Sequence, residues 1–152
     1  MANPLTLLMP VVPNTPVANL LQLIGQNQTA IDAALTNIGT VHFARFLVFD
    51  RSEPNLQPTS ASADNLVLAV ITAYDGDFKA YISDFANQIG DVFNALLQVV
   101  VGGPPLIPVQ NNLVAFTNFI QANDASQMQG APGLYSAYPQ TVQEILAAFP
   151  PQ

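Results

Sequence analysis

The chain has 152 residues, which is enough for one domain, residues 1–152, with a single hydrophobic core. Half of the residues are apolar and only 9% are charged, against roughly 25% in an average soluble domain, so we expect a second subunit or a hydrophobic ligand to cover part of the apolar surface. Ten acidic and three basic residues give a net charge of −7, and three cations cannot form a basic patch, which argues against nucleic acid and against an anionic membrane as partners.

Two further classes of protein are excluded or disfavoured by composition. The chain has no cysteine, so it has no disulfide, no thiolate chemistry and no cysteine-ligated zinc. Its apolar runs are shorter than the roughly 18 residues that a membrane span needs, and residues 1–13 lack the basic region of a signal peptide. The sequence therefore predicts a cytoplasmic protein.

The N-terminal part predicts a strand followed by a helix. Residues 5–12 are apolar, and Pro10 places this strand at a sheet edge because proline cannot donate to a strand ladder. Thr15 is a candidate N-cap, with a proline directly after it at the first helical position. Apolar residues then follow helical spacing through residue 38, and Gly39 is a typical helix stop.

Two further strands follow, joined by a polar connection. Residues 40–50, TVHFARFLVFD, are rich in aromatic and β-branched residues. Residues 66–74, LVLAVITAY, are apolar almost throughout and predict a strand buried on both faces. The connection, residues 51–65, contains two prolines and three serines. We expect antiparallel pairing of these two strands.

The C-terminal half predicts three helices and one more strand. Residues 78–100 carry a wide apolar stripe at helical spacing, with Asp77 placed to cap the helix. A shorter helix is expected over residues 113–123, and residues 134–138, LYSAY, are a candidate fourth strand. Thr141 and Glu144 form a capping-box pattern that opens a final helix.

This order predicts an α+β fold. Without the extra C-terminal helices it reads βαββαβ, the ferredoxin-like unit, with an antiparallel four-stranded sheet covered by helices on one face. The other face would carry apolar side chains from the strands at residues 40–50 and 66–74. Two such sheets packed face to face would form a homodimeric α+β barrel, which would account for the shortage of charge.

Three blocks of the sequence carry a resemblance to a known superfamily. The segments TVHFARFLVFD, ITAYDGDFKAYISDF and LYSAYPQTVQEIL resemble a set of small, poorly characterised bacterial proteins and, in architecture, the dimeric α+β-barrel superfamily. That superfamily includes dye-decolourising peroxidases, chlorite dismutases, haem-degrading monooxygenases and quinol-type monooxygenases. The resemblance implies a barrel that binds a hydrophobic small molecule, with haem as one candidate, but a fold does not fix a function.

The peroxidase motif is only partly present. The dye-decolourising peroxidases carry Gly-x-x-Asp-Gly, and here Asp75 and Gly76 supply the last pair while Thr72 stands in place of the first glycine. Their proximal histidine lies far downstream, whereas this chain has no histidine after His42. These departures argue against peroxidase chemistry.

His42 and Arg45 are the first candidates for a site. Alternation along a strand places His42 and Phe46 on one face and Arg45 on the other. His42 is the chain's one histidine; it is either a haem ligand or general base that faces a pocket, or a structural histidine with a hydrogen-bonded partner. Arg45 needs an anion if it is buried, which would be Asp75, Asp77 or a carboxylate of the ligand.

Further candidates flank the third strand and the LYSAY segment. Asp75 and Tyr74 could face a binding site, whereas helix capping explains Asp77. Tyr135 is either a core aromatic or part of a pocket wall. Three aspartates recur every seven residues on the helix over residues 78–100, but an apolar stripe lies beside them, so we expect a solvated edge and no metal site. The aspartates are Asp77, Asp84 and Asp91.

Three functions remain open at this point. The first is a homodimer that binds a hydrophobic small molecule, haem among the candidates, through His42, Arg45, Phe46, Tyr74 and Tyr135. The second is a structural or accessory oligomer that holds no ligand. The third is a cofactor-free monooxygenase-like enzyme that uses His42 or Asp75 as its base.

Overall fold

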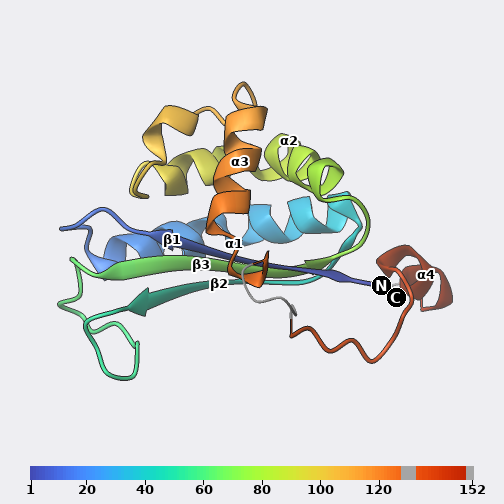
Figure 1. Cartoon of the computed structure of the whole chain (residues 1–152), viewed down its shortest axis with the longest axis horizontal. Helices are drawn as coiled ribbons and strands as arrows, with labels where there is room; N and C mark the ends of the chain where they lie inside the picture. Colours follow the sequence, from blue (N-terminus) through green and yellow to red (C-terminus); the bar gives the residue numbers. More distant parts are fainter. Residues whose placement is uncertain (128–132, 150–152) are drawn as a thin grey trace.

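A three-stranded antiparallel sheet forms the floor of the structure, and the main helices lie on one of its faces (Figure 1). The computed structural model describes residues 1–127 and 133–149. The strands are β1 (Asn3–Pro10), β2 (Val41–Asp50) and β3 (Leu66–Tyr74), in the order β1-β3-β2. The first three of the four predicted strands, and the antiparallel pairing of β2 with β3, are confirmed.

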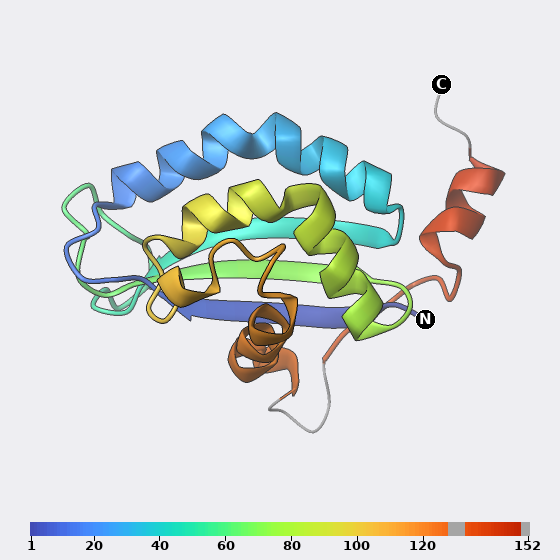
Figure 2. The ribbon, with the colours of Figure 1, turned by 90° about the horizontal axis from the view of Figure 1, so that it is seen from above.

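Two long helices, α1 (Val17–Ile38) and α2 (Phe78–Leu97), cover the sheet. The shorter α3 (Leu113–Asn123) lies at the β1 side, and α1 lies at the opposite side, beyond β2 (Figure 2). A last helix, α4 (Val142–Ala148), sits apart at the end of the sheet where β2 begins. Two short 3₁₀ turns, η1 (Pro104–Leu106) and η2 (Ala125–Gln127), flank α3 in the chain.

Local sequence signals set several helix ends, although the predicted Thr15 cap of α1 is wrong because Pro16 is the N-cap and the Thr15 hydroxyl donates to the Val12 carbonyl. Gly39 ends α1 in the left-handed conformation, at φ 67°, which glycine adopts without strain. The Asp77 carboxylate accepts a hydrogen bond from the Ala80 N–H and caps α2. The predicted capping box at the start of α4, between Thr141 and Glu144, is confirmed.

The strand register gives the sheet two different faces. One face packs its side chains against the helices, including Leu68 and Val70 of β3. The other, which we call the open face, is covered by none of the helices in the described residues (Figure 1). Alternation from the observed register assigns twelve side chains to the open face, apolar except for a threonine and an arginine: Pro4, Thr6, Leu8, Pro10, Phe43, Arg45, Leu47, Phe49, Val67, Ala69, Ile71 and Ala73.

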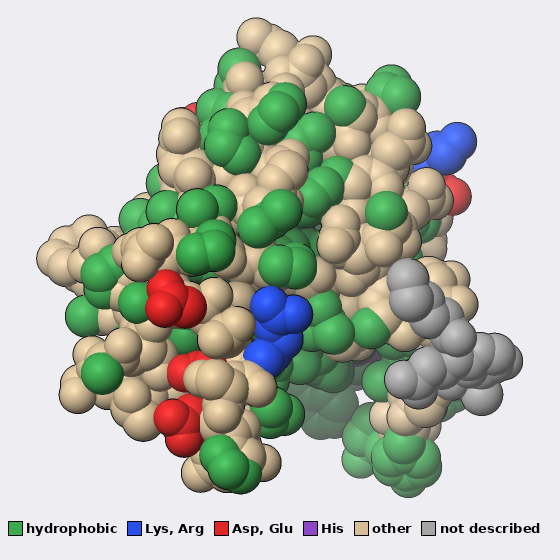
Figure 3. Space-filling view, turned by 60° about the vertical axis from the view of Figure 1, so that its left-hand side comes forward, with side chains coloured by type: hydrophobic (Ala, Val, Ile, Leu, Met, Phe, Trp, Pro, Cys, Tyr) green, Lys and Arg blue, Asp and Glu red, His purple; other side chains and the backbone are tan. Residues whose placement is uncertain are grey.

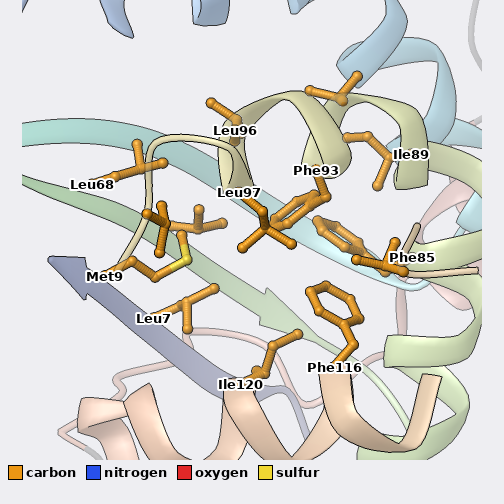
Figure 4. Packing of buried hydrophobic residues seen from close by; sticks show 14 of the residues in the cluster. Leu7, Met9, Leu68, Phe85, Ile89, Phe93, Leu96, Leu97, Phe116 and Ile120 are labelled. Carbon is orange, nitrogen blue, oxygen red and sulfur yellow. The ribbon is translucent and has the colours of Figure 1, made fainter. Parts of the chain in front are cut away.

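The core lies between the sheet and the helices (Figure 4). Three phenylalanines from α2 and α3 meet edge to face, with Phe93 between Phe85 and Phe116. Leu7 and Met9 of β1 reach the same cluster from below. The apolar stripe predicted for residues 78–100 is therefore the centre of the core.

The predicted fourth strand does not form, so the prediction of a four-stranded ferredoxin-like sheet is wrong. The predicted barrel of two such four-stranded sheets is wrong for the same reason. Residues 133–141 contain no strand, and Tyr135 and Tyr138 are exposed. The outer edge of β1 is instead occupied by the end of α3 and by η2, where Asp124 forms an isolated bridge with Leu7. The coarser prediction, an α+β fold, is confirmed.

Charge is sparse on the molecular surface, as the composition implies. Figure 3 shows one side of the molecule, on which few acidic or basic side chains stand among apolar and neutral ones. In the described ranges, none of the helices combines the length and the apolar character that crossing a bilayer requires.

Candidate functional site

His42 lies at an irregularity near the start of β2. Val41 is aligned with Tyr74 of β3 and Phe43 with Ala73, so His42 is an extra residue in the ladder, as in a β-bulge. The bulge also shifts the alternation at this end of the strand, and Val41 packs against the core on the helix side. Strict alternation, which places Val41 on the same face as Phe43, fails at this point.

The bulge brings His42 to Asp75, the residue that follows β3. The His42 Nε2 atom lies 2.9 Å from Asp75 Oδ1, and both side chains are mostly buried, 19% and 11% exposed. In the described part of the chain this is the one acid–base contact within 4.0 Å. Two of the candidate residues, 33 positions apart in sequence, therefore form a histidine–aspartate pair.

The second oxygen of Asp75 joins this pair to α4. Asp75 Oδ2 accepts a hydrogen bond of 2.7 Å from the backbone N–H of Val142, the first residue of α4. The side chain of Gln143 donates a second hydrogen bond, of 2.6 Å, to the carbonyl oxygen of Gly39. α4 is thereby fastened to the junction between α1 and β2.

These contacts decide the ionisation of Asp75. Burial raises the pKa of the Asp75 carboxyl and is the largest single influence. The hydrogen bonds from Val142 and His42 act in the opposite direction, as do the charge of His42 when its ring is protonated and the charge of the N-terminus, and together they hold the pKa of Asp75 below the ordinary value of 3.8. Asp75 is therefore a carboxylate at neutral pH.

A groove opens beside the pair. It has a volume of about 430 Å³ and lies between the C-terminal half of α1, the start of β2 and α4. Leu35, Val41, Phe43 and Leu146 give it apolar walls, and its polar side chains are those of His42, Asp32 and Thr36. A mainly apolar groove with a few polar side chains is typical of a site for a small molecule.

The chemistry available to His42 follows from its partner. Because Asp75 is an anion that can only accept, Nε2 carries the proton in the neutral ring, and Nδ1 then has the free lone pair. Nδ1 has no hydrogen bond within the described residues. His42 can thus accept a proton at Nδ1 while Asp75 stabilises the cation that forms.

The other predicted site residues do not converge on this groove. Phe46 packs against the core on the helix side, whereas Arg45 is exposed on the open face. Tyr74 is buried and stacked on Tyr81, with 4.0 Å between ring centroids, and burial followed by the charges of Asp124 and Asp77 raises its pKa to about 12.

Tyr135 and Arg45 also differ from their expected surroundings. Tyr135 is 86% exposed and lines a separate depression beside residues 1–4. Arg45 has no carboxylate within 4.0 Å in the described ranges, so neither Asp75 nor Asp77 serves as its counterion. Asp75 is paired with His42 instead.

Two contributors to the site were missed in the sequence. Val142 and Gln143 hold Asp75 and Gly39 across more than 60 residues of chain. The capping box at Thr141 marked the start of α4 correctly, and the free N–H groups of a helix start are natural partners for a carboxylate. Nothing in the local pattern specified which carboxylate that would be.

Comparison with known proteins gave no match to this chain among protein-family models, curated proteins or solved structures. The resemblance to the small bacterial proteins therefore stays a prediction. Functional inference rests on the geometry of the groove.

Proposed function

We propose that this protein binds a small, mainly apolar molecule in the groove beside His42, and that His42 is the polar contact and proton acceptor for that molecule. The observation that carries the proposal is the His42–Asp75 pair, in which His42 lines a mainly apolar groove and its Nδ1 is available. A weakly acidic O–H group, as in a phenol, an enol or a quinol, suits this arrangement because its proton can pass to Nδ1.

Haem is supported less well than an organic molecule. Because Nε2 of His42 is engaged by Asp75, an axial bond to iron could come only from Nδ1. Arg45, a candidate for binding a propionate, lies on the open face, and Tyr135 lies in a different depression. A cofactor-free proton transfer therefore agrees better with the groove than a haem reaction does.

Binding of 4-nitrophenol tests the proposal, because this phenol reports its own ionisation by a shift of its absorption to longer wavelength. We expect saturable binding at neutral pH with an increase of the phenolate band. His42→Gln should weaken binding by about tenfold or more, the loss of one hydrogen bond to a charged group. Asp75→Asn should bind more weakly and lose the increase in phenolate.

Asp84→Asn is the matched control. Asp84 is an exposed aspartate of α2 outside the groove, and its variant should bind like the parent protein. Each variant is first compared with the parent by thermal melting, so that a loss of fold is recognised. Unchanged binding in His42→Gln, or no saturable binding by the parent protein, would refute the proposal.

A homodimer formed through the open face is the second candidate, and it agrees with a structural or accessory role. The face is apolar at ten of its twelve positions, and Phe43 on it is 46% exposed. An apolar area of this kind on a protein with so few charges favours a partner.

The dimer is tested by sedimentation equilibrium of the parent protein and of Leu47→Asp. Leu47 lies on the open face opposite Ala69 of the central strand β3. The parent protein should sediment as a dimer, and the added carboxylate should shift it to the monomer. Leu21→Asp, at an exposed position of α1, should leave the dimer intact. A monomeric parent protein would contradict this candidate.

A further inference from the structure

The two outer edges of the sheet differ in how their backbone groups are satisfied. On the β1 edge, Pro4 and Pro10 have no N–H to offer. The N–H of Thr6 donates to Asp124 Oδ1 at 2.9 Å, and the carbonyl of Pro10 accepts from the N–H of Val101 at 2.9 Å. The β1 edge is therefore closed by prolines and by the segments that follow α2 and α3.

Two hydrogen bonds at the end of β2 show which of its backbone groups point away from β3. The N–H of Arg51 donates to the carbonyl of Asn65, toward the β3 side, at 2.9 Å. The N–H of Asp50 donates instead to Leu56 in the following turn, at 3.0 Å. Because backbone groups of successive residues in an antiparallel strand point to opposite sides, the groups of every second residue before Asp50 also point away from β3.

Ala44, Phe46 and Val48 are those residues. Within residues 1–127 and 133–149, their N–H groups have no hydrogen-bond partner outside the β2–β3 ladder, and that ladder lies on their other side. β2 is ten residues long and contains no proline and no lysine, two of the devices by which natural edge strands avoid pairing. The bulge at His42 is a further device of this kind, but it precedes this stretch, so the edge from Ala44 to Val48 is open to another strand.

The surroundings of this edge favour one kind of occupant. α1 lies beyond β2 on the helix side (Figure 2), so an added strand would run beneath α1. A second copy pairing through its own β2 would bring its own α1 to the same place, and the two helices would collide. A single extended peptide avoids that collision.

The side chains around the edge indicate the chemistry of the peptide. Toward the helices, an added strand would meet apolar groups such as Leu35 and Val41, which line the groove at this end. Toward the open face it would lie beside Arg45, an exposed cation with no carboxylate within 4.0 Å in the described ranges. Apolar residues on one side and an acidic residue on the other complement both surfaces.

We propose that the β2 edge binds an extended peptide of a partner protein as an added antiparallel or parallel strand, with apolar side chains beneath α1 and an acidic side chain beside Arg45. This mode of recognition gains affinity from backbone hydrogen bonds and specificity from alternate side chains. The two proposals share Leu35 and Val41 as contacts, but the backbone groups of Phe46 and Val48 that would bind the peptide do not depend on His42.

Fluorescence anisotropy with a labelled heptapeptide of alternating valine and threonine, with glutamate at its centre, tests the proposal. The peptide should bind saturably. The same peptide methylated at alternate backbone nitrogens should bind about tenfold or more weakly, because each methyl group removes a donor and blocks the ladder. Equal affinity for the two peptides would overturn the proposal.

Paired variants of the protein locate the peptide. Val48→Pro removes one outward N–H and should weaken binding about threefold to tenfold relative to Val48→Ala, which removes side-chain atoms and keeps the N–H. Circular dichroism shows whether both variants fold. Equal binding by two folded variants would exclude the β2 edge, and the methylated peptide still tests strand addition if Val48→Pro does not fold.

Charge reversal in the peptide tests the role of Arg45. Replacing the central glutamate by lysine should weaken binding about threefold to fivefold, the effect of an exposed charge pair. Arg45→Ala should abolish this difference, and Arg51→Ala should retain it.

His42→Gln should bind the peptide normally, so failure of the small-molecule site and failure of the peptide site are separable. If the parent protein is a dimer and Val48→Pro converts it to a monomer, the β2 edge binds a second copy and not a peptide, and the proposal is overturned.

Discussion

Phe93→Ala should lower the free energy of unfolding by about 3–5 kcal/mol, the range for removing a buried aromatic ring. Phe93 is 1% exposed and stands between two other rings. Its centroid lies 5.0 Å from that of Phe85 and 5.7 Å from that of Phe116, with interplanar angles of 68° and 67°. The truncation removes both edge-to-face contacts and leaves a cavity between α2 and α3. Urea denaturation at neutral pH measures the loss.

Phe149→Ala is the control for this experiment. Phe149 follows α4 and is 77% exposed, so its truncation should change the free energy of unfolding by no more than about 0.5 kcal/mol. A loss below about 1 kcal/mol for Phe93→Ala would mean that α3 does not pack on α2 as observed, because a ring enclosed on both sides cannot be removed so cheaply.

The elements of this fold were predictable because their signals are local. The apolar stripe of α2 needs only the 3.6-residue period of a helix, and the stop at Gly39 and the capping box at Thr141 each depend on residues within one turn. The structure confirms all three. β2 and β3 were likewise recognisable from composition and from the polar connection between them.

Two residues of the candidate site, His42 and Asp75, were named from the sequence, but their arrangement was not predictable. His42 and Asp75 were each candidates because an ionisable side chain stood beside an apolar strand. Their pairing depends on the bulge at His42, and strict alternation contains no sign of an extra residue. The same limit applies to Arg45, for which a carboxylate partner was expected and none lies within 4.0 Å in the described ranges.

The fourth strand was mispredicted because the segment that covers the outer edge of β1 is decided by contacts between residues far apart in the sequence. The segment LYSAY has the aromatic content of a strand, but both of its aromatic side chains, Tyr135 and Tyr138, are exposed to solvent. At the β1 edge the carboxylate of Asp124 accepts a hydrogen bond from the N–H of Thr6, which lies 118 residues earlier in the chain. No pattern within either segment specifies that contact.

Asp124→Ala should consequently lower the free energy of unfolding by about 2–4 kcal/mol, because it leaves partly buried donors without an acceptor. Asp124 is 1% exposed. Its Oδ1 accepts from the N–H of Thr6 at 2.9 Å, from the N–H of Ser126 at 3.0 Å and from the Ser126 hydroxyl at 2.7 Å. Urea denaturation measures the change.

Asp124→Asn separates the hydrogen bonds from the charge. The amide oxygen of asparagine can still accept from Thr6 and Ser126, so we expect a loss of about 1 kcal/mol, well below that of the alanine variant. Asp84→Ala, at an exposed position of α2, should be neutral within about 0.5 kcal/mol. Equal losses for Asp124→Ala and Asp124→Asn would show that the negative charge, and not the acceptor for the Thr6 N–H, stabilises this edge. In that case the β1 edge would differ from the β2 edge in the nearby negative charge of Asp124 as well as in having an acceptor for its outward N–H group.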